Sequence, residues 1–90
     1  MKVTYFATLR AVTGKHEEQW SRPAATVGEL VQEVAARYGP AFGKWVLDGG
    51  ELSKLALILV NGHDVRDLQG GATPVNPEDT VSMIPPVAGG

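Results

Sequence analysis

The chain has 90 residues, a net charge of −2, eleven glycines and no cysteine. This length allows one small domain, and the lack of cysteine excludes disulfides, thiolate metal sites and a cysteine nucleophile. Ten acidic residues against eight basic ones give no electrostatic reason to expect nucleic acid as a partner. The longest apolar run, residues 55–60, is too short to cross a membrane, and the N-terminus lacks a signal-peptide pattern. We therefore expect a soluble, cytoplasmic domain.

The first predicted element is a strand over residues 2–9, which are rich in β-branched and aromatic types. Alternation along this strand places Phe6 on the face opposite to Val3, Tyr5, Ala7 and Leu9. A turn near Gly14 is expected to return the chain as a second strand over residues 17–22.

A helix is predicted next, because residues 26–29 read Thr-Val-Gly-Glu and form a capping box. An apolar stripe follows at steps of three and four residues: Val27, Leu30, Val31, Val34, Ala35 and Tyr38. Gly39 and Pro40 end the helix. Residues 41–54 favour no single type of element.

The remaining chain predicts strands. Residues 55–60 are apolar at every position, which is typical of a central strand covered on both faces. Asn61-Gly62 favours a type I′ turn that reverses the chain into residues 63–65. An irregular connection over 66–75 and a last strand over 80–84 complete the chain order of two strands, one helix and two strands. Because helix and strands are segregated, the predicted class is α+β.

No constellation of catalytic or metal-binding residues is evident. The only histidines, His16 and His63, do not form a helical pair, and no serine lies in a G-x-S-x-G context. The glycine pairs lack the spacing of a phosphate-binding loop. We expect the chain to bind no metal or cofactor and to catalyse no reaction unaided.

The C-terminus carries the strongest functional signal: Pro85, Pro86, Val87, Ala88, Gly89 and Gly90. The two prolines stiffen the exit from the last strand and prevent further sheet pairing. The small residues after them can enter a narrow tunnel, since glycine has no Cβ to block a close approach. We therefore predict a domain over residues 1–84 and a projecting, flexible tail over 85–90, whose terminal carboxylate is presented to other enzymes.

These features together resemble the ubiquitin-like β-grasp sulfur carriers, in particular the small subunit of molybdopterin synthase. The most specific matching stretches are Phe6-Ala7-Thr8-Leu9-Arg10 and the terminal Pro-Pro-Val-Ala-Gly-Gly. Ile84 replaces the aromatic residue that often precedes the two prolines in this family, and the extra length in 40–54 and 63–73 resembles the archaeal-type branch. The resemblance implies a mixed sheet of four to five strands packed on one main helix.

The resemblance also implies the chemistry. An adenylating enzyme similar to ubiquitin-activating enzymes would use ATP to convert the Gly90 carboxylate to an acyl-adenylate, and a sulfur donor would displace AMP to leave a thiocarboxylate. The large subunit of molybdopterin synthase would then take up this sulfur. Gly89 would be the sterically required neighbour, Val87 and Ala88 the threading residues, and Pro85 and Pro86 would set the exit direction.

A partner also needs a docking face, and the resemblance implies that Phe6, Leu68 and Ile84 form one apolar contact surface. The alternative is that Ile84 or Leu68 belongs to the core of the domain itself, which the sequence does not decide.

Three other functions remain open at this level. A ubiquitin-like modifier conjugated through Gly90 to lysines shares the chemistry up to the adenylate. A thiamin-pathway sulfur carrier shares the thiocarboxylate. In an interaction module, the terminal glycines would be incidental.

Overall fold

The computed structural model describes residues 1–86 and shows a mixed sheet packed against helices. The elements in chain order are β1 (Lys2–Tyr5), α1 (Thr8–Thr13), β2 (Glu17–Gln19), α2 (Val27–Tyr38), α3 (Pro40–Val46), β3 (Leu47–Asp48), β4 (Glu51–Leu52), β5 (Leu57–Val60), β6 (His63–Asp64), the 3-10 helices η1 (Val65–Asp67) and η2 (Gly70–Ala72), and β7 (Thr80–Ile84).

The main sheet has five strands in the order β2-β1-β7-β5-β6. Strands β1 and β7 are parallel, whereas the other neighbouring pairs are antiparallel. A separate two-stranded hairpin is formed by β3 and β4. The arrangement confirms the predicted α+β class, with a five-stranded mixed sheet and one main helix.

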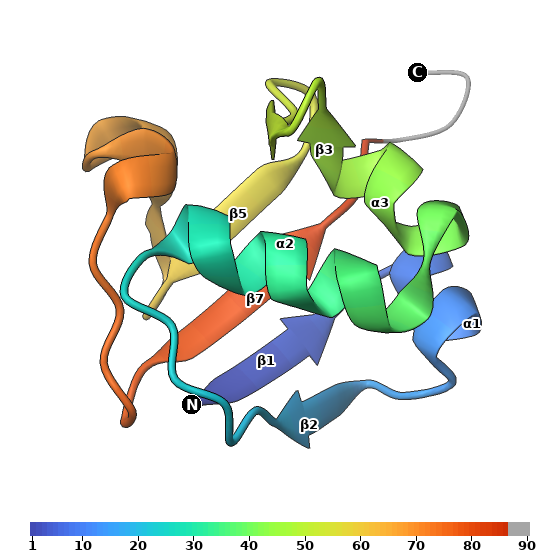
Figure 1. The fold of residues 1–90 in the computed structure, drawn as a ribbon, viewed down its shortest axis with the longest axis horizontal. Helices are drawn as coiled ribbons and strands as arrows, with labels where there is room; N and C mark the ends of the chain where they lie inside the picture. Colours follow the sequence, from blue (N-terminus) through green and yellow to red (C-terminus); the bar gives the residue numbers. More distant parts are fainter. Residues whose placement is uncertain (87–90) are drawn as a thin grey trace.

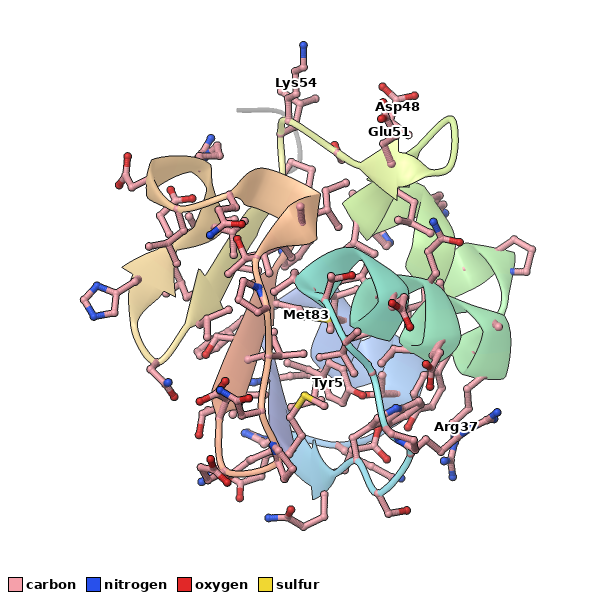
Figure 2. The ribbon with its side chains drawn as sticks, turned by 60° about the vertical axis from the view of Figure 1, so that its left-hand side comes forward. Tyr5, Arg37, Asp48, Glu51, Lys54 and Met83 are labelled. Carbon is pink, nitrogen blue, oxygen red and sulfur yellow. The ribbon has the colours of Figure 1, made fainter. Side chains whose placement is uncertain are left out.

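Helix α2 covers one face of the sheet and crosses β1, β7 and β5 (Figure 1). It begins and ends as predicted: the Glu29 backbone N–H donates to Thr26 Oγ1 at 3.2 Å, and Gly39 follows the last residue. The predicted stripe is buried at Val27, Leu30, Val31, Val34 and Ala35. The core includes alternate sheet residues: Val3, Tyr5, Ile58, Val60, Val81 and Met83. Figure 2 shows Tyr5 and Met83 inside this core.

The predicted strand over residues 2–9 is wrong beyond its first half, because β1 ends at Tyr5 and α1 begins at Thr8. The chain turns at Ala7, whose φ of 52° and ψ of −128° are incompatible with a strand. Leu9 is fully buried, as expected for a core residue, but it reaches the core from α1 and not from the sheet. Burial of Leu9 offsets the backbone strain at Ala7.

The prediction that residues 55–60 are covered on both faces is also wrong. Within β5, Ile58 and Val60 are buried, whereas Leu57 and Leu59 are only half-buried. Ile58 and Val60 are buried because they lie on the face of the sheet that α2 covers. Leu57 and Leu59 lie on the other face and do not pack on the core. The face that carries Leu57 and Leu59 is called the open face below.

Residues 41–54, which the sequence left undecided, form α3 from its second residue onward and the β3–β4 hairpin. Pro40 ends α2 and also starts α3 at a position where its missing N–H costs nothing. The predicted turn at residues 61–62 is confirmed, since Asn61 and Gly62 both have positive φ values, 51° and 85°. The predicted last strand is confirmed as β7. The second strand is shorter than predicted and ends at Gln19.

A buried carboxylate links β2 to α2. Glu18 Oε2 accepts hydrogen bonds from the hydroxyls of Tyr5 and Tyr38, both at 2.5 Å, and Glu18 Oε1 accepts one from Lys15 Nζ at 3.1 Å. The side chain of Glu18 is only 9% exposed. Burial acts to raise the pKa of Glu18, but the hydrogen bonds from Tyr38, Tyr5 and Lys15 outweigh it and hold the pKa below its ordinary value.

The start of α2 lies against η2, and Gly28 permits this contact. A Cβ at Gly28 would lie 3.0 Å from the Gly71 carbonyl oxygen. We expect Gly28→Ala to lower the free energy of unfolding by about 1 kcal/mol, because the clash exceeds the gain in helix propensity. Urea unfolding measures the change. Gly43→Ala in α3 is the matched control, since its Cβ would meet Ala35 Cβ at an ordinary 3.6 Å. Equal effects of both substitutions would contradict the prediction.

Candidate functional site

The open face of the sheet carries an apolar surface formed by four half-buried side chains on three neighbouring strands or their ends. These residues are Phe6, Leu57, Leu59 and Ile84, and we call them the open-face patch. Strand register brings them together: Leu57 is paired with Ile84, and the Phe6 backbone N–H donates to the Met83 carbonyl oxygen at 3.2 Å. None of the four belongs to the core or packs against it.

Two of the three predicted docking residues therefore lie side by side. Ile84 is half-buried and Leu68 is 47% exposed, so the alternative that either is a core residue is wrong. Leu68 follows η1, which comes directly after the edge strand β6. Two strands, β7 and β5, separate β6 from β1. The structure thus places Phe6 and Ile84 side by side in one surface. That Leu68 belongs to the same surface stays a prediction.

Sequence reasoning missed Leu57 and Leu59. Their signal was present as apolar residues at alternate positions of a strand, but the intervening residues Ala56, Ile58 and Val60 are apolar too. A strand that is apolar at every position does not show which of its faces a helix covers. Only the position of α2 on the opposite face identifies these leucines as surface residues.

The chain leaves the sheet next to the open-face patch. Strand β7 ends at Ile84, Pro85 is buried and Pro86 is half-buried, so these first residues of the predicted tail lie against the domain. The predicted threading residues Val87 and Ala88 and the predicted reactive residues Gly89 and Gly90 lie outside the described residues.

The corner between β1 and α1 borders the patch. Arg10 Nε donates to the Tyr5 carbonyl oxygen at 2.9 Å, and the guanidinium carbon lies 5.0 Å from the centroid of the Phe6 ring. Ala7, between them, has a positive φ that alanine rarely adopts. Strained backbone of this kind persists only where its surroundings hold it, and here the buried Leu9 and the Arg10 hydrogen bond do so.

We expect Ala7→Gly to raise the free energy of unfolding by about 1 kcal/mol, because glycine adopts positive φ without a Cβ clash. Urea unfolding measures the change. Ala11→Gly is the control, since Ala11 is exposed within α1 and its loss should destabilise the protein by a similar amount. A lower stability of Ala7→Gly would show that the Ala7 conformation carries no strain.

Within residues 1–86, no three histidine, aspartate or glutamate side chains lie together in a way that could hold a metal ion. None of the helices in this described part combines the length and the apolar character needed to cross a membrane.

Comparison with known sequences decides the family. Residues 3–90 match the ThiS family. The chain belongs to this family of ubiquitin-like sulfur carriers. It is 37% identical over 91 residues to small archaeal modifier protein 3 of Haloferax volcanii, covering 100% of this chain and 98% of that protein. It is also 33% identical over 85 residues to the sulfur carrier protein CysO of Mycobacterium tuberculosis, covering 91% and 89% of the two chains.

Solved structures of relatives confirm the ubiquitin-like β-grasp fold. The CysO structure from the Amycolatopsis orientalis BexX/CysO complex matches 99% of this ThiS-family chain and 98% of that chain, with a TM-score of 0.79 and 29% identity. A Pyrococcus furiosus protein designated as subunit 1 of a molybdopterin converting factor matches 96% and 95% of the two chains, with a TM-score of 0.74 and 30% identity. That CysO thus forms a complex with another protein, BexX.

Proposed function

We propose that this protein is the sulfur carrier for molybdopterin synthesis and that Gly90 carries the sulfur as a thiocarboxylate. The observation that carries the proposal is the position of the chain exit. Strand β7 ends at Ile84, a member of the open-face patch, so the chain leaves the sheet where a protein bound to the patch would lie. The family match extends to residue 90, and one structural relative is designated as a subunit of a molybdopterin converting factor.

The reaction requires activation, because a carboxylate is a poor electrophile. In the proposed sequence, a Gly90 carboxylate oxygen attacks the α-phosphorus of ATP and pyrophosphate leaves. A hydrosulfide-type donor then attacks the carbonyl carbon, AMP leaves, and the thiocarboxylate remains as a soft nucleophile. ATP, and zinc where it is present, belong to the activating enzyme, and this chain holds no cofactor. The large subunit of molybdopterin synthase accepts the sulfur.

Mass spectrometry tests the proposal. Incubation of the full chain with its adenylating enzyme, ATP and sulfide should raise the mass by about 16 Da as oxygen is replaced by sulfur. Addition of the synthase large subunit and its pterin substrate should reverse this increase. A chain lacking Gly90 is the control and should gain no sulfur. An unchanged mass of the wild-type chain would overturn the proposal, and a thiocarboxylate that the large subunit does not consume would overturn its molybdopterin part.

A second function, conjugation to lysines of other proteins, is favoured by one observation. A relative that matches the whole chain at 37% identity is called a modifier protein. Both functions share the acyl-adenylate, after which a lysine amine would replace sulfide as the nucleophile. Digestion of cellular proteins should then yield branched peptides in which Gly90 is joined to a lysine, and none should form with a chain that lacks Gly90.

A further inference from the structure

We propose that Arg10 binds a carboxylate of the adenylating enzyme at the margin of the open-face patch. The inference rests on the proposed function and adds a partner contact to it: an acidic side chain that lies beside an apolar surface.

The first observation is the fixed orientation of the Arg10 guanidinium. Its Nε–H is bound to the Tyr5 carbonyl oxygen, and its plane lies near the Phe6 ring. These two contacts hold the side chain over the end of β1 although Arg10 itself is exposed. An arginine that is already ordered loses less rotamer entropy when a partner binds it.

The second observation is that the outer nitrogens of Arg10 have no partner within residues 1–86. Among residues 1–86, neither Nη1 nor Nη2 of Arg10 has a hydrogen-bond partner, and no carboxylate lies within ion-pairing distance. Four other basic residues do pair with carboxylates in this part of the chain: Lys2, Lys15, Arg22 and Arg66. The two outer nitrogens form a planar fork that matches a carboxylate.

The third observation concerns which protein can reach Arg10. Gly90 is four residues beyond Pro86, so its Cα can lie at most roughly 14 Å from that of Pro86. Any enzyme that acts on the Gly90 carboxylate must therefore approach the end of β7. Phe6 is bonded to Met83 at that end, and Arg10 lies against Phe6. The enzyme that receives the C-terminus is thus brought to the corner that Arg10 occupies.

The strain at Ala7 agrees with this role. A glycine would form the same turn without strain, yet alanine keeps the corner stiffer in the unbound protein. The turn places Arg10 over Phe6 through the backbone hydrogen bond from Arg10 N–H to the Ala7 carbonyl oxygen at 3.0 Å.

Steady-state AMP formation by the adenylating enzyme, with ATP and sulfide in excess, tests the proposal, with the full-length carrier as the varied substrate. Arg10→Gln should raise the KM for the carrier by about 10-fold or more with little change in kcat, because a charged, oriented contact is lost. Arg10→Lys should raise the KM by a smaller factor, because lysine keeps the positive charge although it lacks the planar fork. The KM of the wild-type carrier should rise with salt concentration, and that of Arg10→Gln should rise less.

Arg37→Gln is the matched control. Arg37 also stacks on aromatic rings, 5.6 Å from the Trp20 centroid, and has no carboxylate partner in the described part of the chain. It projects from α2, in the layer opposite to the open face (Figure 2). The KM of the adenylating enzyme for the Arg37→Gln carrier should match that for the wild-type carrier.

Three outcomes would overturn the inference. The first is an unchanged KM for the Arg10→Gln carrier, and the second is a KM for this carrier that rises with salt as steeply as that of the wild type. The third is an equal rise in KM for Arg10→Gln and Arg10→Lys, accompanied by an equal fall in melting temperature. The last result would mean that Arg10 only positions Phe6. An enzyme that forms no AMP with the wild-type carrier would instead overturn the proposed function, and the partner named here with it.

Discussion

Replacing Leu57 by aspartate is expected to lower kcat/KM for adenylation of the carrier by at least about 10-fold, or ~1.4 kcal/mol. Leu57 belongs to the open-face patch and is paired with Ile84 at the strand end from which the chain leaves the sheet. An aspartate there would place a charge in the apolar contact and leave it without a partner when the enzyme binds. Because Leu57 is only half-buried and outside the core, the domain should stay folded.

Circular dichroism and thermal unfolding check the fold of the Leu57→Asp protein. Ala36→Asp is the control for charge, since Ala36 is exposed on α2 and distant from the open face. Its kcat/KM should equal that of the wild type. Leu68→Asp tests the predicted extension of the docking surface: a loss comparable to that of Leu57→Asp would place Leu68 in it. A folded Leu57→Asp protein with wild-type kcat/KM would show that the enzyme does not contact the open-face patch.

Glu18→Ala is expected to lower the free energy of unfolding by about 3 kcal/mol. The substitution removes the acceptor of two tyrosine hydroxyls, of which Tyr5 is fully buried, and leaves these polar groups without a partner. Urea unfolding at pH 7 measures the loss. Glu17→Ala is the matched control: Glu17 is exposed, pairs with Lys2 at 3.5 Å, and should cost less than about 1 kcal/mol.

The Glu18 contribution should depend on pH in a defined direction. The hydrogen bonds hold the pKa of Glu18 below its ordinary value of 4.5 despite the opposing effect of burial, so the folded state favours the ionised carboxylate. The stabilisation is therefore complete above pH 4.5 and is lost as the pH falls through the lowered pKa of the folded state. The difference in the free energy of unfolding between wild type and Glu18→Ala should therefore become smaller as the pH is lowered from 7. A difference that does not change with pH would contradict this assignment.

High pH should weaken the same cluster. Burial, and then the hydrogen bond to Glu18, raise the pKa of the Tyr5 hydroxyl above its ordinary value of 10.0. The folded state therefore favours the neutral hydroxyl. Its contribution is complete below pH 10.0 and is lost as the pH rises further, because only the unfolded chain then ionises readily.

The elements that the sequence determined by itself are those whose causes are local. Helix α2 was predictable because its cap, its apolar stripe and its terminal glycine lie within residues 26–39. The turn at Asn61-Gly62 and the last strand were predictable for the same reason. The C-terminal motif identified the family, which the match to residues 3–90 confirmed.

The end of the first strand was not predictable from local propensity. Phe6 and Thr8 are strand-forming types, but the chain turns at Ala7 so that Leu9 enters the core from α1. Tertiary burial of one leucine outweighs both the strand preference and the strain at Ala7. The partners of Glu18 were equally hidden, because Tyr5 and Tyr38 are 13 and 20 residues away in the chain.

The sequence alone thus determined the family and the main helix, while the tertiary structure decided which surface lies at the end of β7. Apolar residues fill both faces of β5, and their types are the same whether a helix covers them or a partner does. Placement of α2 on one face makes Ile58 and Val60 core and leaves Leu57 and Leu59 beside Ile84 and Phe6. The candidate site depends on that placement, because the packing of helix against sheet determines which side chains are exposed, and residue type alone does not.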